Sequence, residues 1–127
     1  MLCINFNLFV YIYISIECSN LLLEVLCLEV QLCSVTSNSA RLKELYPKTL
    51  NLTAAITDPR TMGIIREEGG KMYMSEGLWD EAYNEFYQSF RCYQEAGNSR
   101  AKDCLKYVVL ASMLVRRVYR CLACLYS

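Results

Sequence analysis

Residues 69–82, "GGKMYMSEGLWDEA", decide how the middle of this 127-residue chain folds. Their Gly-Gly-Lys start resembles part of a phosphate-binding loop. Such a loop requires a second glycine five residues upstream, a lysine followed by serine or threonine, and a preceding strand. Here Met72 follows the lysine, position 65 is isoleucine, and the preceding "RTMGIIREE" has a helical pattern. The stretch is therefore not predicted to bind a nucleotide.

The same residues fit two antiparallel helices in close contact. Small and aromatic residues follow the spacing of a tetratricopeptide-type repeat, at Gly70, Tyr73, Ala82, Phe86 and Ser89. The small residues would let the two helices approach, while Tyr73 and Phe86 would fill the groove and reach the next hairpin. Glycine inside a helix costs about 1 kcal/mol relative to alanine, so close packing must offset that cost. We predict that these glycines are structural.

Helical patterns continue on both sides of this repeat. Apolar and small residues recur with helical spacing at Leu21, Val25, Leu28, Leu32 and Val35; at Leu42, Leu45, Tyr46, Leu52 and Ile56; at Met62, Ile65, Gly69, Met72 and Tyr73; at Trp79, Ala82, Tyr83, Phe86, Phe90 and Tyr93; and at Cys104, Val108, Ala111 and Val115. We predict an all-α fold of about five helices, arranged as antiparallel hairpins of a TPR-like right-handed solenoid.

One repeat length further on, the pattern begins again and then stops. Adding about 34 residues places Cys104 and Tyr107 where Gly70 and Tyr73 stand. The partner helix of that repeat would need apolar residues near positions 116 and 120, and both positions are arginine. We therefore expect the repeat array to break off here.

Local signals predict where the helices begin. Asn38 or Ser39 can cap the second helix, and Ser99 can cap the fifth. Asp58 followed by Pro59 is a strong start for the third helix, because aspartate accepts backbone N–H groups and proline fits the first helical position.

Glycine and proline predict where the helices end or bend. Gly77 and Gly97 should end the third and fourth helices. Pro47 lies inside the second helical pattern, where proline costs roughly 3 kcal/mol. We expect it to kink or split that helix.

Residues 2–16, "LCINFNLFVYIYISI", are apolar and uncharged. They lack the basic region and the cleavage site of a signal peptide. As a membrane helix they are shorter than the required ~20 residues, and Glu17 and Glu24 close the segment. Their composition favours a strand over a helix. We interpret the segment as foreign to the domain, either disordered or an extra helix, and consider a membrane partner unexpected.

Composition excludes several classes of function. Lys plus Arg and Asp plus Glu number 13 each, so the net charge is zero and no nucleic-acid partner is indicated. There is no histidine, which removes imidazole bases and mixed Cys/His zinc sites. The eight cysteines lie largely in apolar helical stretches and are predicted to be reduced. We expect no catalytic residue, cofactor, metal or small-molecule substrate.

Residues 61–114, with "IREEGGKM" and "YQEAGNSRAKDCLKYVVLASML" as markers and "LLLEVLCLEVQL" upstream, resemble the PCI family. Members of this family occur in the proteasome lid, the COP-nine signalosome and initiation factor three, and the resemblance is to a signalosome subunit. It implies a non-catalytic scaffold that supports cullin deneddylation, with other signalosome subunits and cullin-RING ligases as partners, in nucleus and cytoplasm. Residues 19–114 would be a truncated fragment of the helical-repeat region, between a non-matching apolar segment (1–18) and a non-matching tail (115–127).

Two groups of residues are candidates for partner contacts. The stretch from Arg100 to Arg120 is strongly basic, and Arg100, Lys102 and Lys106 could face an acidic partner or belong to a solvated helix face. The second group, Tyr83, Tyr87 and Tyr93, could anchor an interface or pack in the core. The ends of an interrupted repeat stack are also candidates, because each leaves an apolar face uncovered.

Three other functions remain open for this sequence. The chain could be a free-standing TPR-like module that binds a peptide, a fragment of a proteasome-lid PCI subunit, or a small protein anchored in a membrane by residues 2–16.

Overall fold

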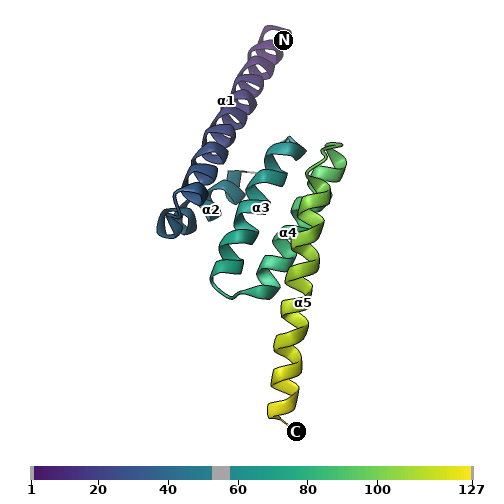
Figure 1. Ribbon diagram of the computed structural model, residues 1–127. Helices are drawn as coiled ribbons and strands as arrows, with labels where there is room; N and C mark the ends of the chain where they lie inside the picture. The colour runs from purple at the N-terminus through teal and green to yellow at the C-terminus, as the bar shows by residue number, and fades with distance from the viewer. Residues whose placement is uncertain (1, 53–57, 127) are drawn as a thin grey trace.

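The computed structural model describes residues 2–52 and 58–126, and this part of the chain contains five helices and no strand. The helices are α1 (Leu2–Val35), α2 (Ser39–Leu52), α3 (Pro59–Ser75), α4 (Trp79–Glu95) and α5 (Ala101–Leu125), and they follow one another across the molecule (Figure 1). The predicted all-α fold is confirmed. Ile56, which was expected in the second helix, lies outside the described residues.

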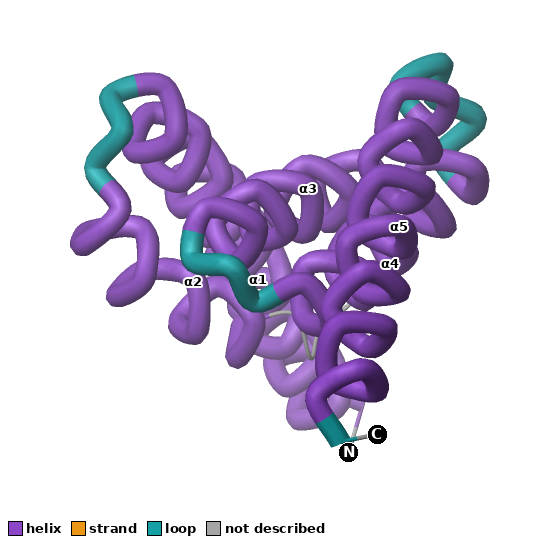
Figure 2. Tube along the Cα trace, turned by 60° about the horizontal axis from the view of Figure 1, so that its bottom comes forward, coloured by secondary structure: helices purple, strands orange, loops and turns teal. Residues whose placement is uncertain are grey.

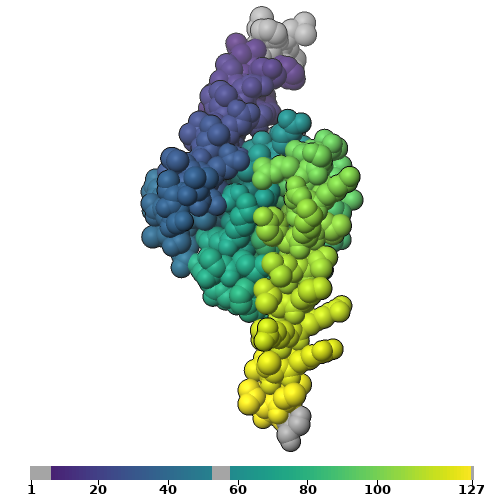
Figure 3. All heavy atoms as spheres, in the orientation of Figure 1, coloured from purple at the N-terminus to yellow at the C-terminus, as the bar shows by residue number. Residues whose placement is uncertain are grey.

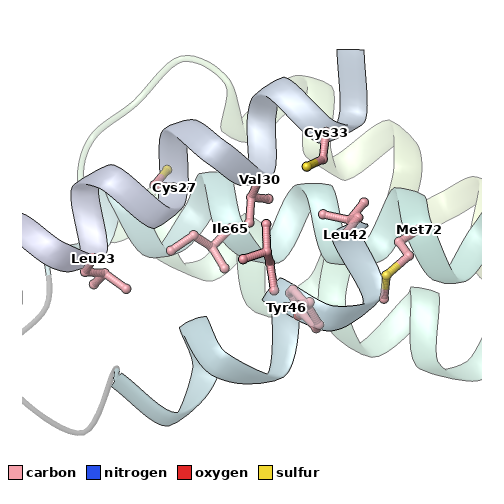
Figure 4. Close-up of a cluster of buried hydrophobic side chains, with 9 residues drawn as sticks. Leu23, Cys27, Val30, Cys33, Leu42, Tyr46, Ile65 and Met72 are labelled. Atoms are coloured by element: carbon pink, nitrogen blue, oxygen red, sulfur yellow. The ribbon is translucent and has the colours of Figure 1, made fainter. Parts of the chain in front are cut away.

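The central element is α3, which packs against α1, α2 and α4, while α5 packs against α4 (Figures 1 and 2). Two hydrophobic clusters lie on the two sides of α3. The first joins α1, α2 and α3 (Figure 4) and consists of Leu23, Cys27, Val30, Cys33, Leu42, Leu45, Tyr46, Ile65 and Met72. The second joins α4 and α5 and consists of Ala82, Phe86, Tyr93, Cys104, Val108 and Ala111.

The helix predicted from the spacing of Leu21 to Val35 is confirmed in α1. The five residues of that stripe are, however, 59–84 % exposed, and the opposite face of the helix is buried in the first cluster. Both faces of α1 are apolar, so periodicity alone does not distinguish them. Glu17 and Glu24 fall on the same side as Leu21 and Leu28 at 100° per residue. The buried face is the one without charged residues, since a buried carboxylate would need a partner.

Residues 2–16 continue directly into α1 as a helix, so the expected strand preference is wrong. A helix satisfies its own backbone hydrogen bonds and therefore needs no neighbouring strand. The 34 residues of α1 extend for about 51 Å, and their N-terminal end projects beyond the body of the molecule (Figure 3). Among the described helices, one stretch, Asn7–Val35, is long and apolar enough to cross a membrane, by length and composition alone. Residues 2–16 are thus part of a helix that is longer than the ~20 residues a membrane span requires.

The predicted starts of α2 and α3 are confirmed. The Asn38 side chain accepts the backbone N–H of Arg41 at 3.3 Å, and Asp58 accepts that of Thr61 at 3.4 Å. At α5 the prediction is wrong, since Asn98, and not Ser99, accepts a backbone N–H, that of Arg100, at 3.0 Å.

The predicted ends of α3 and α4 are confirmed, because Gly77 and Gly97 have φ angles of +76° and +64°. In contrast, α2 is not split at Pro47 and continues to Leu52. Proline removes only one helical N–H, and α2 is held by buried side chains on both sides of it, including Tyr46 and Thr49.

The last helix, α5, continues well past Val115 to Leu125, and its C-terminal half projects beyond the body (Figure 3). Its inner face is buried at Cys104, Val108 and Ala111. On its outer face Leu105, Val109 and Met113 are exposed.

Candidate interaction surface

The repeat residues place α3 and α4 in direct contact. A Cβ atom added to Gly70 would lie 2.7 Å from two ring atoms of Phe86, closer than van der Waals contact permits. Ala82 is fully buried, and Ser89 is fully buried with its hydroxyl donating to the carbonyl of Gly63 at 2.6 Å. These residues form the packing surface between the two helices.

The two aromatic repeat residues connect α3 and α4 to opposite neighbours. Phe86 stacks on Tyr107 with ring centroids 5.1 Å apart, and so reaches α5. Tyr73 packs edge-on against Tyr46 at 6.0 Å, and so reaches back to α2, and it also packs against the second cluster. The pair therefore links successive helices across the central element.

Two further glycines of α3 make close approaches that the repeat pattern did not identify. A Cβ on Gly63 would lie 2.7 Å from the ring of Tyr93, and one on Gly69 would collide with the ring of Tyr46. A sequence signal existed, because Gly63 and Gly70 are seven residues apart and share one helix face. Gly69 faces the other neighbour.

A buried carboxylate in α3 organises the contact with α5. Glu67 is only 4 % exposed. It accepts hydrogen bonds from the Tyr93 hydroxyl at 2.7 Å and from the Arg100 guanidinium at 3.2 Å, and it pairs with Lys71 at 3.0 Å. Burial and the hydrogen bond to Glu67 raise the pKa of Tyr93, so its hydroxyl remains a donor.

The next residue, Glu68, is also buried, and it pairs with Lys71 at 2.8 Å. Partial burial opposes the charged form of Lys71, but hydrogen bonds to Glu68 and Glu67 raise its pKa. This ammonium therefore stays charged between the two carboxylates. Sequence analysis did not predict either buried glutamate.

A second polar group ties α2, α3 and α4 together. Both carboxylate oxygens of Glu85 accept the Arg66 guanidinium at 3.0 Å, and the Tyr46 hydroxyl donates to the same carboxylate. Burial and the bond to Glu85 raise the pKa of Tyr46. Tyr46, Arg66 and Glu85 thus serve contacts inside the molecule.

The candidate interface residues lie at the start of α5 and differ in what they do. Arg100 pairs with Glu67 and lies 5.8 Å from the ring centre of Tyr93, so it is partly structural. Lys106 pairs with Asp103 at 2.8 Å on the surface, and Lys102 is exposed. Both Arg100 and Lys106 line a hollow of about 340 Å³ between α3 and α5, together with Glu67, Lys71, Asp103 and Tyr107. Lys102 and Lys106 are the two available to a partner.

The three candidate tyrosines divide between core and surface. Tyr93 is fully buried and belongs to the second cluster. Tyr87 is exposed and stacks on the half-buried Tyr83 with ring centroids 6.3 Å apart. Only Tyr87 is therefore placed on the surface.

The cysteines Cys18, Cys27, Cys33, Cys92, Cys104, Cys121 and Cys124 are free thiols, and Cys92 among them is half-buried. Cys18, Cys121 and Cys124 are exposed, whereas Cys27, Cys33 and Cys104 are buried. Burial, with a smaller contribution from Glu68, raises the pKa of Cys27 to about 11, and burial also raises the pKa of Cys104. A raised pKa leaves little reactive thiolate near neutral pH.

At about pH 8 we expect iodoacetamide to modify the native protein at Cys18 at least about 100-fold faster than at Cys27, which is both less ionised and covered. Mass spectrometry after cleavage at glutamate separates Cys18, Cys27 and Cys33 into different peptides. The same labelling in denaturant is the control and should equalise the rates. Similar native rates for Cys18 and Cys27 would contradict the packing of α1 on α3.

The fold and this surface define a class, an all-helical segment of packed helix pairs whose outermost helices have exposed apolar faces. Within the described part of the chain, no group of His, Cys, Asp and Glu side chains could hold a metal ion. No family model matches the chain.

Similar proteins identify the kind of segment. Over 94 residues the chain is 51% identical to COP9 signalosome complex subunit 2 of Dictyostelium discoideum, covering 74% of this chain and 21% of that protein. The chain is also 53% identical over 93 residues to the same subunit of Schizosaccharomyces pombe, and 45% identical over 95 residues to that of Drosophila melanogaster. These matches cover 73% and 75% of this chain, respectively, and 21% of each of the two relatives. The resemblance to the COP9 signalosome is confirmed, and the matched residues form a segment homologous to its subunit 2. The chain spans about a fifth of the length of these relatives.

Proposed function

We propose that this chain acts as a non-catalytic scaffold segment in a COP9 signalosome assembly and supports cullin deneddylation through protein contacts. The similarity to subunit 2 carries this proposal. We further propose other signalosome subunits and cullin-RING ligases as partners, and nucleus and cytoplasm as locations.

The outer face of α5 supports the proposal, since it is available for contact. Lys102 is exposed, and the side chain of Lys106 is 78% exposed although it pairs with Asp103. In contrast, the polar groups Glu67, Arg66 and Glu85 are occupied by internal hydrogen bonds. Contacts from α5 to an acidic partner surface are therefore compatible with an undisturbed core.

The test is capture of signalosome subunits and cullins by the tagged full chain from cell extract, quantified by immunoblot. The expected result is recovery well above that of an untagged control. The bait Lys102→Glu/Lys106→Glu should recover several-fold less, because it places carboxylates opposite an acidic partner.

The matched control is Lys48→Glu/Arg91→Glu, which makes the same charge change at exposed positions on α2 and α4. It should recover as much as the unmodified chain. Failure of every bait to recover signalosome subunits would reject the proposed function. Equal recovery by all three baits would keep the scaffold function and remove Lys102 and Lys106 from it.

A further inference from the structure

The two outermost helices of the molecule both present an uncovered apolar face. On α1 this outer face consists of Leu21, Val25, Leu28, Leu32 and Val35, with Glu17 and Glu24 along one edge. On α5 the outer face consists of Leu105, Val109 and Met113, followed by Arg116 and Arg120 on the same side at 100° per residue. In a stack of helices each repeat is covered only by its neighbours, and no helix of the described residues covers either face.

The charges on the two outer faces are opposite. In the part of α1 that forms the face, Glu17, Glu24 and Glu29 are the charged residues, and all are acidic. Beyond Asp103, every charged residue of α5 is basic. None of the ion pairs among the described residues uses Glu17, Glu24, Arg116 or Arg120. These four charges are therefore available for contacts outside the molecule.

The charges are also placed in a matching order along the two helices. Glu17 and Glu24 lie at the N-terminal end of the α1 face, and Arg116 and Arg120 lie at the C-terminal end of the α5 face. Antiparallel packing of α1 on α5 would bring these ends together and would leave the apolar parts opposite each other. Successive helices of this fold already run antiparallel, so the contact would repeat the packing within the chain.

We propose that the outer face of α1 in one copy packs antiparallel on the outer face of α5 in a second copy, so that copies associate head to tail. The two helices α1 and α5 lie on opposite flanks of the molecule (Figure 1), so each copy can make both contacts at once. The contact is heterologous, because it joins two different surfaces, and it therefore produces rings or chains of copies rather than a closed dimer. This inference goes beyond the proposed function, since it concerns the chain by itself.

A single helix pair is smaller than a standard protein interface, so the association should be weak and concentration-dependent. In analytical ultracentrifugation at low salt, the average mass of the full chain should rise from 14.7 kDa to more than about twice that value as the concentration increases. It should fall back at about 1 M salt, where the Debye length is about 3 Å.

Charge reversal separates this contact from other forms of association. The variants Glu17→Arg/Glu24→Arg and Arg116→Glu/Arg120→Glu should each remain monomeric, because like charges then face each other. Mixing the two variants should restore association, since each acidic face then meets a basic one. The chain with all four substitutions should also associate again.

Two control variants make the same changes in net charge away from both faces. They are Glu81→Arg/Glu95→Arg and Arg60→Glu/Arg91→Glu, all at exposed positions, and both should associate like the unmodified chain. Circular dichroism checks that every variant is folded.

Three results would overturn the proposal. The first is a monomer at every concentration. The second is a mass that stops at a dimer and is unaffected by Arg116→Glu/Arg120→Glu, which would indicate that α1 pairs with itself. The third is that added phosphatidylcholine vesicles abolish self-association and that the protein floats with the vesicles, which would make a lipid bilayer the partner of α1.

Discussion

Replacing Phe86 by alanine should lower the free energy of unfolding by about 4 kcal/mol. The Phe86 ring is 1 % exposed, fills the contact with Gly70 and stacks on Tyr107 at 5.1 Å. Its removal would leave a cavity at the junction of α3, α4 and α5, three helices that cannot close together without losing their other contacts. Denaturant unfolding followed by circular dichroism measures the change.

The neighbouring Tyr87 provides the matched control. It is also aromatic and on α4, but it is exposed. Tyr87→Ala should therefore cost less than about 1 kcal/mol. Equal losses for Phe86→Ala and Tyr87→Ala would show that Phe86 is not the central packing residue of the second cluster.

Replacing Gly70 by valine should destabilise the fold by about 3 kcal/mol. The Cβ atom of the new valine would lie 2.7 Å from the Phe86 ring. The ring cannot easily move away, because it stacks on Tyr107. Either the ring or the whole of α4 must move. Valine in place of glycine gains some helix propensity, and the overlap exceeds that gain. The same unfolding measurement applies.

Gln88→Val is the control for the effect of placing valine in a helix without a close contact, because residue 88 is an exposed position on α4. That substitution should change stability by less than about 0.5 kcal/mol. The sharper check is the double variant. With Phe86 already alanine, the valine at residue 70 has space, so its cost should fall by at least about 1 kcal/mol. Additive costs would mean that the two residues do not act through one contact.

The helices between residues 21 and 115, and several of their ends, could be predicted because their causes are local. Asp58, Gly77 and Gly97 act through their own backbone neighbours, and all three are where the pattern placed them. Pro47 is also a local signal, but its effect depends on tertiary packing. The buried residues around it keep α2 continuous.

The buried side of α1 could not be predicted in the same way, because it depends on contacts distant in sequence. Both sides of that helix are apolar, and α3 covers the one without glutamate. Burial of Glu67 likewise requires Tyr93 and Arg100, which lie 26 and 33 residues further along the chain. The repeat spacing identified Gly70 and Phe86, but it carried no information about the polar contacts around them.

Neighbours in space are mostly neighbours along the chain in this structure, since α3 meets α4 and α4 meets α5 through short turns. Each such contact closes only a short loop, so little chain entropy is lost before it forms. Chains with this sequence-local topology reach their native state in about microseconds to milliseconds. The α3–α4 hairpin can thus form early and serve as the template on which the outer helices are added one at a time.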